Sequence, residues 1–591
     1  MNKIGYPFNN SEQLRKRKSI KRLLSEKLGR QPRVLKIAIL GGATMNVLGE
    51  ILEIYLLQNG YEIELYYSDF SRYYEEIVFG TGNLWNFDPD YILIHTTFRD
   101  LKDLPITGNG PDEVERKLNA EFAKITQMWT AIKEKSNAII IQNNFEFPRL
   151  RLLGNSANTE NFGLVRFVNM LNLQLSDSIK SNVGIVLNDL NYLSAQFGLE
   201  SWFNESQWIN YKYAYEVNAC WSVASSLANI IHSILGNSKK CLILDLDNTL
   251  WGGVIGDDGL GGICLGSESA QGESFISFQK YILQLKERGV LLAICSKNDL
   301  EIARSGFGHS DSVLQLDDFA VFKASWRTKE EMIREIASEL NIGLNSLVFI
   351  DDNPAERQLV KMSLPMVEVP EIGENVLDYP RFIESNGYFE SIKVVQEDLF
   401  KHRVYQENKQ RAVLAASILD YNEYLLSLKM IAEFSRFRSN NVDRIVQLIN
   451  KTNQFNLTNL KIDVNKVTAS MNNPNYFTLQ ARLLDIFGDN GIVSLFIGNI
   501  IDDTLSIDLW VMSCRVFKRN LEHAIMDEVI HYCKKQNIKT IVGRYNESGK
   551  NKIVAKLYLD FGFKEQDSNT FIFDLRFSNI KFNQVIEISH A

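Results

Sequence analysis

Two carboxylates, Asp245 and Asp247, directly follow the apolar run Leu242–Leu244. The run predicts a buried strand, and the C-terminal end of such a strand is where open α/β sheets bind ligands. Thr249 and the glycines after it predict a turn whose backbone N–H groups can face an anion. Two acids this close repel each other when both are ionised, so a divalent cation or one retained proton is expected between them. The segment is therefore a candidate site for an anion and a metal ion.

Polar residues also lie at the ends of two later predicted strands and at the start of a later predicted helix. A second predicted buried strand ends at Ser296, a predicted helix begins near Lys329, and a third buried strand ends in the paired acids Asp351 and Asp352. Hard carboxylate oxygens suit Mg²⁺, which keeps several waters and also accepts phosphate oxygens as ligands. We expect the ends of these elements to meet at one edge of a parallel sheet.

The run Asp-Leu-Asp-Asn-Thr-Leu at residues 245–250 resembles the first motif of the haloacid dehalogenase (HAD) phosphatases. The resemblance implies that Asp245 is the nucleophile, which forms an aspartyl-phosphate, and that Asp247 is the general acid/base. The chemistry fits both roles, because a carboxylate can accept a phosphoryl group and the leaving oxygen needs a second acid within reach.

The three later segments resemble the remaining HAD motifs. The resemblance implies that Ser296 holds phosphate, that Lys329 neutralises the nucleophile and the phosphate, and that Asp351 is the most direct Mg²⁺ ligand. The expected phosphate-binding residues are Ser296, Lys329 and Thr249, and the expected metal-binding residues are Asp245, Asp247, Asp351 and Asp352.

Longer segments around these motifs resemble the FkbH-like family, the glyceryl transferase/phosphatases of polyketide pathways. They are residues 251–259, 272–279, 294–299 and 349–357. The resemblance implies that the protein takes a three-carbon unit from 1,3-bisphosphoglycerate, removes phosphate, and delivers glyceryl to an acyl carrier protein with Mg²⁺ as cofactor.

The chain of 591 residues predicts a multidomain α/β protein. We expect a helical lead-in over residues 1–34, an SGNH-hydrolase-like domain over 35–236, a HAD-like domain over 237–395 and a GNAT-like α+β domain over 396–591. In the SGNH-hydrolase-like domain, strands separated by helical patterns indicate a parallel sheet. Its first turn, Leu40–Thr44, has no serine, and no histidine follows Asp189 within the next few residues. A serine nucleophile needs an adjacent base, so we expect a platform for a partner and not a hydrolase.

The C-terminal segment resembles GNAT acyltransferases in three places. One is the helix and loop that contain Asn453, another is the alternating strand that leads to residues 514–520, and the last is the closing segment 557–563. In such proteins the turn after the strand holds the pyrophosphate of coenzyme A. The glycine positions of that turn are Lys518 and Asn520 here, so we expect pantetheine alone to lie along the strand. The expected pantetheine and acyl-binding residues are Arg515, Arg519, Asn453 and Arg544, with Gln454 beside them.

A covalent glyceryl intermediate suits a cysteine, because exchange between two thioesters is nearly isoenergetic. Cys514 precedes Arg515 and a predicted helix start, which would favour its thiolate. Cys295 adjoins Ser296, next to the expected phosphatase centre, but ends a predicted buried strand. Both remain candidates, and a buried, inert cysteine is the commoner fate of each.

Composition excludes several classes of protein. The formal net charge is −8 with no basic tail, which argues against a nucleic-acid binder. No apolar run is long enough for a membrane span, and the six cysteines show no metal-ligand spacing, so a cytoplasmic protein is expected. Two alternatives stay open: a Mg²⁺-dependent HAD-like phosphatase of small metabolites with partner-binding outer domains, and a non-enzymatic scaffold with relic motifs.

Overall fold

The computed structural model describes residues 5–6, 10–28, 32–393, 401–462, 464–548, 550–577 and 580–590. The chain forms two compact units, Met1–His232 and Ser233–Ala591. The expected multidomain α/β class is confirmed. Within the described residues, none of the helices combines the length and the apolar character that crossing a bilayer requires.

The first unit is built on a parallel sheet of order β2-β1-β3-β4-β5. Its strands are β1 (Arg33–Leu40), β2 (Tyr61–Tyr67), β3 (Tyr91–Ile94), β4 (Ile139–Asn143) and β5 (Ile185–Asn188). Its longer helices are α1 (Asn10–Ser25), α2 (Asn46–Gln58), α5 (Pro111–Lys135), α6 (Leu164–Ser181) and α10 (Cys220–Ile234). The alternation of strands and helices predicted from the sequence is therefore observed, with apolar residues of β1, β3 and β4 buried in its core.

The second unit begins with a parallel sheet of order β8-β7-β6-β9. Its strands are β6 (Cys241–Leu244), β7 (Leu291–Ser296), β8 (Val321–Ala324) and β9 (Leu347–Ile350). The helices that follow them include α11 (Ile255–Asp258), α12 (Ala270–Glu287), α13 (Leu300–Ser305), α14 (Lys329–Glu339), α15 (Pro354–Ser363) and α16 (Tyr379–Ser385). Strands β6 and β9 are buried along their whole length, as their apolar sequences predict.

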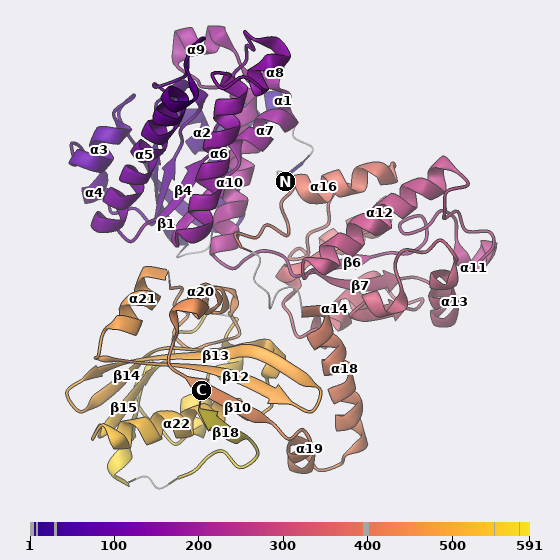
Figure 1. Ribbon diagram of the computed structural model, residues 1–591. Coiled ribbons are helices and arrows are strands. Elements are labelled where there is room, and N and C mark those ends of the chain that lie inside the picture. Colours follow the sequence, from indigo (N-terminus) through magenta and orange to yellow (C-terminus); the bar gives the residue numbers. More distant parts are fainter. Residues whose placement is uncertain are drawn as a thin grey trace. The chain divides into compact units, whose positions relative to one another are not determined.

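A larger, mostly antiparallel sheet occupies the C-terminal part of the same unit, in the order β16-β17-β15-β14-β13-β12-β10-β18. Its long strands are β12 (Tyr476–Asp485), β13 (Gly488–Ile501) and β14 (Thr504–Met512), and its shorter ones are β10 (Ile431–Ser435), β15 (Thr540–Arg544), β16 (Lys564–Asp567), β17 (Thr570–Asp574) and β18 (Glu587–His590). Helices α20 (Val442–Lys451) and α21 (Val464–Asn472) cover one face, and α22 (Leu521–Lys535) covers the other (Figure 1). Helices α18 (Lys401–Ser417) and α19 (Tyr421–Ser427) lead into this α+β domain.

One pair of strands in this sheet diverges. Strands β14 and β15 run parallel but pair only over Thr504–Ser506, after which the two-residue strand β11 (Phe455–Asn456) pairs with the far end of β14. The Leu457 N–H and the Thr458 hydroxyl donate to carbonyls of the same strand. The chain itself therefore satisfies the edge of β14 that a separating neighbour would have exposed.

The compact units divide at His232, four residues before the predicted limit at 236. The predicted limit at 395 falls among residues 394–400, which lie outside the described residues.

Candidate active site

Three carboxylates from two neighbouring strands meet at the C-terminal edge of the β6 sheet. Asp245 follows β6, and Asp351 and Asp352 follow β9, its parallel partner. One oxygen from each of the three lies within 4.8 Å of the others. The Asp351 side chain is fully buried and Asp245 is 8% exposed. The expected convergence of these acids is therefore present.

A buried ammonium group lies among these acids. Lys329, the first residue of α14, is 2% exposed, and its Nζ donates to Asp245 Oδ2 at 2.9 Å and also to Asp351 Oδ2. Burial by itself would lower the pKa of Lys329, but the charges of Asp245 and Asp351 outweigh burial and raise it. Lys329 therefore stays protonated at neutral pH and partly neutralises the acidic cluster.

The pKa values of the neighbouring acids are shifted as well. Burial and the charge of Asp245 raise the pKa of Asp351, against the opposing effect of Lys329. Burial and Asp245 also raise the pKa of Asp352. Each shift reflects carboxylates held close together in a site with little water, which is the arrangement that a divalent cation stabilises.

Asp247 lies outside the group of three carboxylates. Its Oδ1 accepts from the Trp251 indole N–H at 2.9 Å and the Ile255 backbone N–H at 3.0 Å, and its Oδ2 accepts from Asn298 at 3.2 Å. Burial raises the pKa of Asp247, against the hydrogen bonds that it accepts. The Asp247 carboxyl is thus half-buried and firmly oriented, two residues from Asp245, and its side chain is not part of the group that could hold a metal ion.

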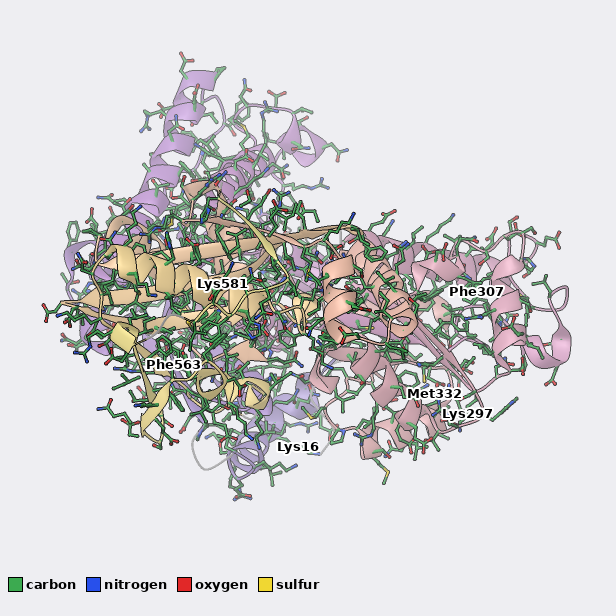
Figure 2. The ribbon with its side chains drawn as sticks, turned by 90° about the horizontal axis from the view of Figure 1, so that it is seen from below. Lys16, Lys297, Phe307, Met332, Phe563 and Lys581 are labelled. Atoms are coloured by element: carbon green, nitrogen blue, oxygen red, sulfur yellow. The ribbon has the colours of Figure 1, made fainter. Side chains whose placement is uncertain are left out.

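The residues that orient Asp247 and the acidic loop were not singled out from the sequence. Besides Trp251 and Asn298, the nearly buried Arg357 donates from one nitrogen to the backbone carbonyls of Asp351 and Asp352, at 2.8 and 2.7 Å. All three lie inside the segments that resemble the FkbH-like family. The resemblance therefore marked these residues, but it gave none of them a role. Phe307, labelled in Figure 2, packs edge-on against the Trp251 ring at 5.4 Å and fixes it.

Two expected phosphate-binding residues lie in different situations. Ser296 ends β7 at the same sheet edge as Asp245 and is 2% exposed. Thr249 is fully buried, and its hydroxyl contacts Asp352, accepting from the backbone N–H at 3.2 Å and lying 3.4 Å from Oδ1. The Thr249 hydroxyl therefore holds Asp352 in place.

The residues present fit a hard divalent cation. The Asp245 Oδ1 atom is buried and has no hydrogen-bond partner among the described residues, whereas Oδ2 contacts Lys329. An unsatisfied carboxylate oxygen in a buried site is costly, and a metal ion would relieve that cost. Oxygen ligands from Asp245, Asp351 and Asp352 are the donor set that Mg²⁺ prefers.

The two candidate cysteines lie at opposite ends of the β6 sheet. Cys295 is fully buried at the end of β7, its Sγ contacts the Lys329 carbonyl at 3.7 Å, and burial raises the pKa of its thiol. Cys514 is half-buried and lines a pocket together with Lys240, Leu291 and Ser346. Lys240 precedes β6, Leu291 is the first residue of β7, and Ser346 precedes β9, so the pocket lies at the N-terminal end of this sheet. Strand β6, whose four residues span about 13 Å, therefore lies between the pocket and Asp245.

The expected acyl-binding residues divide between the pocket and other places. Asn453, Gln454 and Arg515 line the pocket with Cys514. Arg519 is 5% exposed and turns into an ion pair with the buried Asp485 carboxylate at 2.9 Å.

Arg544 is exposed on β15 and is not among the pocket residues. The pantetheine expected along β14 meets a strand edge already occupied by residues 455–458, so the structure does not favour that position.

The corresponding edge of the first unit carries a buried polar network. His95 is 1% exposed, and its two ring nitrogens contact Asn143 at 2.7 Å and Tyr215 at 3.1 Å. Asp189 caps α7 (Leu190–Phe197) and accepts from Asn144. These side chains are therefore engaged in hydrogen bonds within the unit.

Comparison with known proteins was made by family and by structure. The family described as "FkbH, N-terminal domain" matches residues 36–232. The crystal structure of the N-terminal part of the protein BF1531 from Bacteroides fragilis, which contains a phosphatase domain and is complexed with Mg, is 31% identical, with a TM-score of 0.59. The match covers 64% of this chain and 99% of that one. No functionally curated protein matches the sequence significantly.

Acetyltransferases are similar to a smaller part of the chain. The ribosomal-protein-S18-alanine N-acetyltransferase from Escherichia coli is 12% identical, with a TM-score of 0.21, over 26% of this chain and 100% of its own. A GNAT-family acetyltransferase from Staphylococcus aureus is 16% identical, with a TM-score of 0.21, over 24% of this chain and 99% of its own. Matches of this kind do not bear on the activity of the C-terminal domain.

Proposed function

The chain belongs to the FkbH-like family, and from that premise we propose that it is a Mg²⁺-dependent HAD-type phosphatase that also transfers a glyceryl unit to an acyl carrier protein. The observation that supports the phosphatase is the buried contact of Lys329 with Asp245 and Asp351, beside an Asp245 oxygen without a partner. Bound Mg²⁺ would neutralise charge on the phosphate and the carboxylates.

The phosphoryl transfer uses Asp245 and Asp247. Asp245 attacks the phosphorus atom, the bond from phosphorus to the substrate oxygen breaks, and the proton on Asp247 goes to that oxygen. The same group then takes a proton from water, which attacks the aspartyl-phosphate and releases inorganic phosphate. Lys329 stabilises the negative charge that gathers on the transferred group, and Ser296 lies at the same sheet edge to bind its oxygens.

The acyl transfer uses a thiol. In 1,3-bisphosphoglycerate the carbon-1 phosphate is an acyl phosphate, and attack by a cysteine thiolate forms a thioester and releases inorganic phosphate. The pantetheine thiolate of a carrier protein then displaces the cysteine. Cys514 is the more accessible candidate, because Cys295 is fully buried and burial raises the pKa of its thiol.

The experiment combines phosphate release with mass spectrometry of a carrier protein. Protein, Mg²⁺ and 1,3-bisphosphoglycerate are incubated with the carrier, and we expect a glyceryl adduct on its pantetheine thiol. Asp245→Asn should stop release of the carbon-3 phosphate, Cys514→Ala should prevent loading, and Cys295→Ala should load. Loading by both cysteine variants would refute the covalent relay, and release by Asp245→Asn would refute the phosphatase assignment.

One observation favours a second candidate function, in which the protein is a small-metabolite phosphatase without acyl transfer. Cys514 and Asp245 lie at opposite ends of the β6 sheet, so a unit held on Cys514 cannot reach Asp245 without moving. Phosphate release without any adduct on the carrier would favour this second function.

A further inference from the structure

A pocket of about 400 Å³ lies within the Ser233–Ala591 unit, at the N-terminal end of the β6 sheet. Segments that precede β6, β7 and β9 form one wall, and residues 451–454 and 512–517 form much of the other. The walls meet closely at Gly236, where a Cβ atom would lie 2.0 Å from the Asn450 carbonyl oxygen. Because the catalytic acids follow the same strands, this pocket is separate from the phosphatase centre.

The lining of the pocket is strongly cationic. Seven lining residues are Lys or Arg and one is Glu, in a chain whose formal net charge is −8. The cationic residues are Lys239, Lys240, Arg288, Arg444, Lys451, Arg515 and Lys550, and the acid is Glu390. Such a concentration of one sign raises the local concentration of an opposite charge. The pocket is therefore suited to an anionic ligand.

Some of these cations already have partners. Lys239 forms an ion pair with Glu368 at 3.0 Å, Arg288 donates to the Phe389 carbonyl, and Arg515 donates to the Ser513 hydroxyl. Arg444 also has partners, because it donates to Gln447 and to the Ile492 carbonyl. The case for an anion therefore depends on Lys240 and Lys550.

Lys240 and Lys550 both line the pocket, and their like charges act on each other. Burial, and then the charge of Lys240, lower the pKa of Lys550. Within the residues that the structure describes, no carboxylate forms an ion pair with either lysine. Two ammonium groups that line one pocket repel each other, and an anion bound beside both of them would replace that repulsion with attraction. This pair marks the end of the pocket where the charge of a ligand would lie.

The remaining lining is largely apolar and contains a thiol. Leu448, Met512, Phe517 and Ile342 line the pocket, with the Cys514 side chain among them. The Asn341 side chain donates to the Cys514 carbonyl at 3.2 Å and holds this residue against the wall. Inorganic phosphate would make no use of such a lining, whereas an arm with apolar and amide groups would bury against it.

We propose that this pocket binds a phosphate ester that carries an extended, partly apolar arm, of the 4′-phosphopantetheine kind, with its phosphate beside Lys240 and Lys550. The binding itself is independent of the phosphatase centre. The role of such an arm as the acyl acceptor rests on the function proposed above. The occupied edge of β14 leaves this pocket, and not the strand, as the place for the arm.

The test measures equilibrium binding of 4′-phosphopantetheine to the full chain carrying Asp245→Asn, which prevents consumption of the ester. Parallel titrations use pantetheine without phosphate, coenzyme A, 3-phosphoglycerate and inorganic phosphate. The double variant Lys240→Gln/Lys550→Gln removes the cationic pair. Its matched control, Lys539→Gln/Lys552→Gln, removes two exposed lysines of the same unit that pair with Asp503 and Glu547, outside the pocket.

We expect the pocket variant to weaken binding of phosphopantetheine at least about tenfold, because charge-assisted contacts to the phosphate are lost, and the control to leave it unchanged. Affinity should fall with added salt. The bound ester should also protect Cys514 from alkylation by iodoacetamide, read by peptide mass spectrometry.

Equal binding by the two double variants would overturn the proposal. Pantetheine binding as tightly as its phosphorylated form would also overturn it, as would tighter binding of 3-phosphoglycerate or inorganic phosphate. Coenzyme A competing at the same site would support the class of ligand, and failure to protect Cys514 would contradict it. Failure of any of these leaves the phosphatase assignment intact, because that assignment depends on phosphate release by Asp245.

Discussion

Replacement of Lys329 by Gln removes the buried positive charge from the acidic cluster while keeping a polar side chain of similar length. The ammonium group is 2.9 Å from Asp245 Oδ2 and contacts the fully buried Asp351. At an effective dielectric constant of 20, one such ion pair is an attraction of about 6 kcal/mol before the cost of burying both charges is subtracted. Removing one partner of a buried pair typically destabilises a protein by about 3–5 kcal/mol.

The same change should slow phosphate release. Lys329 donates where negative charge gathers in phosphoryl transfer, and removing one preorganised donor of this kind typically costs about 10²–10³ in kcat. We therefore expect Lys329→Gln to lose at least about a hundredfold in kcat while it still folds. The matched control is Lys323→Gln, which removes a lysine that pairs with the exposed Glu339 in the same domain.

Two assays separate the catalytic from the structural effect. Steady-state phosphate release gives kcat, and thermal unfolding with and without Mg²⁺ gives stability. Without Lys329 the three carboxylates repel each other more strongly, so Mg²⁺ should raise the unfolding temperature of the variant more than that of the wild type. Wild-type kcat in Lys329→Gln, with unchanged stability, would refute this assignment of Lys329.

Burial raises the pKa of Glu146 to about 7, so the folded protein keeps a proton that the unfolded chain releases from about pH 4.5 upward, and stability falls as pH rises across that window. Glu146→Gln should remove this pH-dependent loss of stability, which amounts to about 3 kcal/mol by pH 8, as measured by hydrogen exchange of the first unit. An unchanged dependence of stability on pH in the variant would contradict the prediction. Asp485 accepts from Arg411 and Arg519 with a fully buried side chain, so Asp485→Asn should cost about 3–5 kcal/mol in urea unfolding, and a cost below about 1 kcal/mol would show that the network contributes little. Mg²⁺ at about a hundred times its Kd should stabilise the folded protein by about 2.7 kcal/mol, an effect that chelation reverses and that Asp351→Asn abolishes; an equal gain in that variant would place the ion elsewhere.

The acidic cluster could be predicted because strand direction fixes where chain-distant residues meet. Asp245 and Asp351 each follow a short apolar strand, and parallel strands bring their C-terminal ends to one edge. The contact of Lys329 with both acids follows from a helix that begins at the same edge. The order of the strands and the family resemblance sufficed for these positions.

Other features depend on three-dimensional packing that no local pattern encodes. The orientation of Asp247 depends on Asn298, a residue of a different strand end, and the role of Thr249 is set by its contact with Asp352. Arg519 could be read as an anion-binding residue, but it is turned away by Asp485, a partner 34 positions earlier. Sequence alone also could not show that Cys514 lies at the end of the β6 sheet opposite Asp245.

The pocket beside Cys514 illustrates the same limit. Its lysines and arginines come from segments that are hundreds of residues apart, from Lys240 to Lys550. None of them stands out in the sequence by itself. Only the fold of the Ser233–Ala591 unit shows that these cationic residues line one pocket.

The central claim is that Asp245 is the phosphoryl acceptor, and trapping the aspartyl-phosphate tests it most directly. Protein mixed with Mg²⁺ and the phosphorylated three-carbon substrate is quenched with borohydride, which reduces an acyl phosphate to the alcohol, and peptides are read by mass spectrometry. We predict homoserine at position 245 only when substrate and Mg²⁺ are both present. Phosphate release with an unmodified Asp245, or with the reduced residue at Asp247, Asp351 or Asp352, would contradict the assignment.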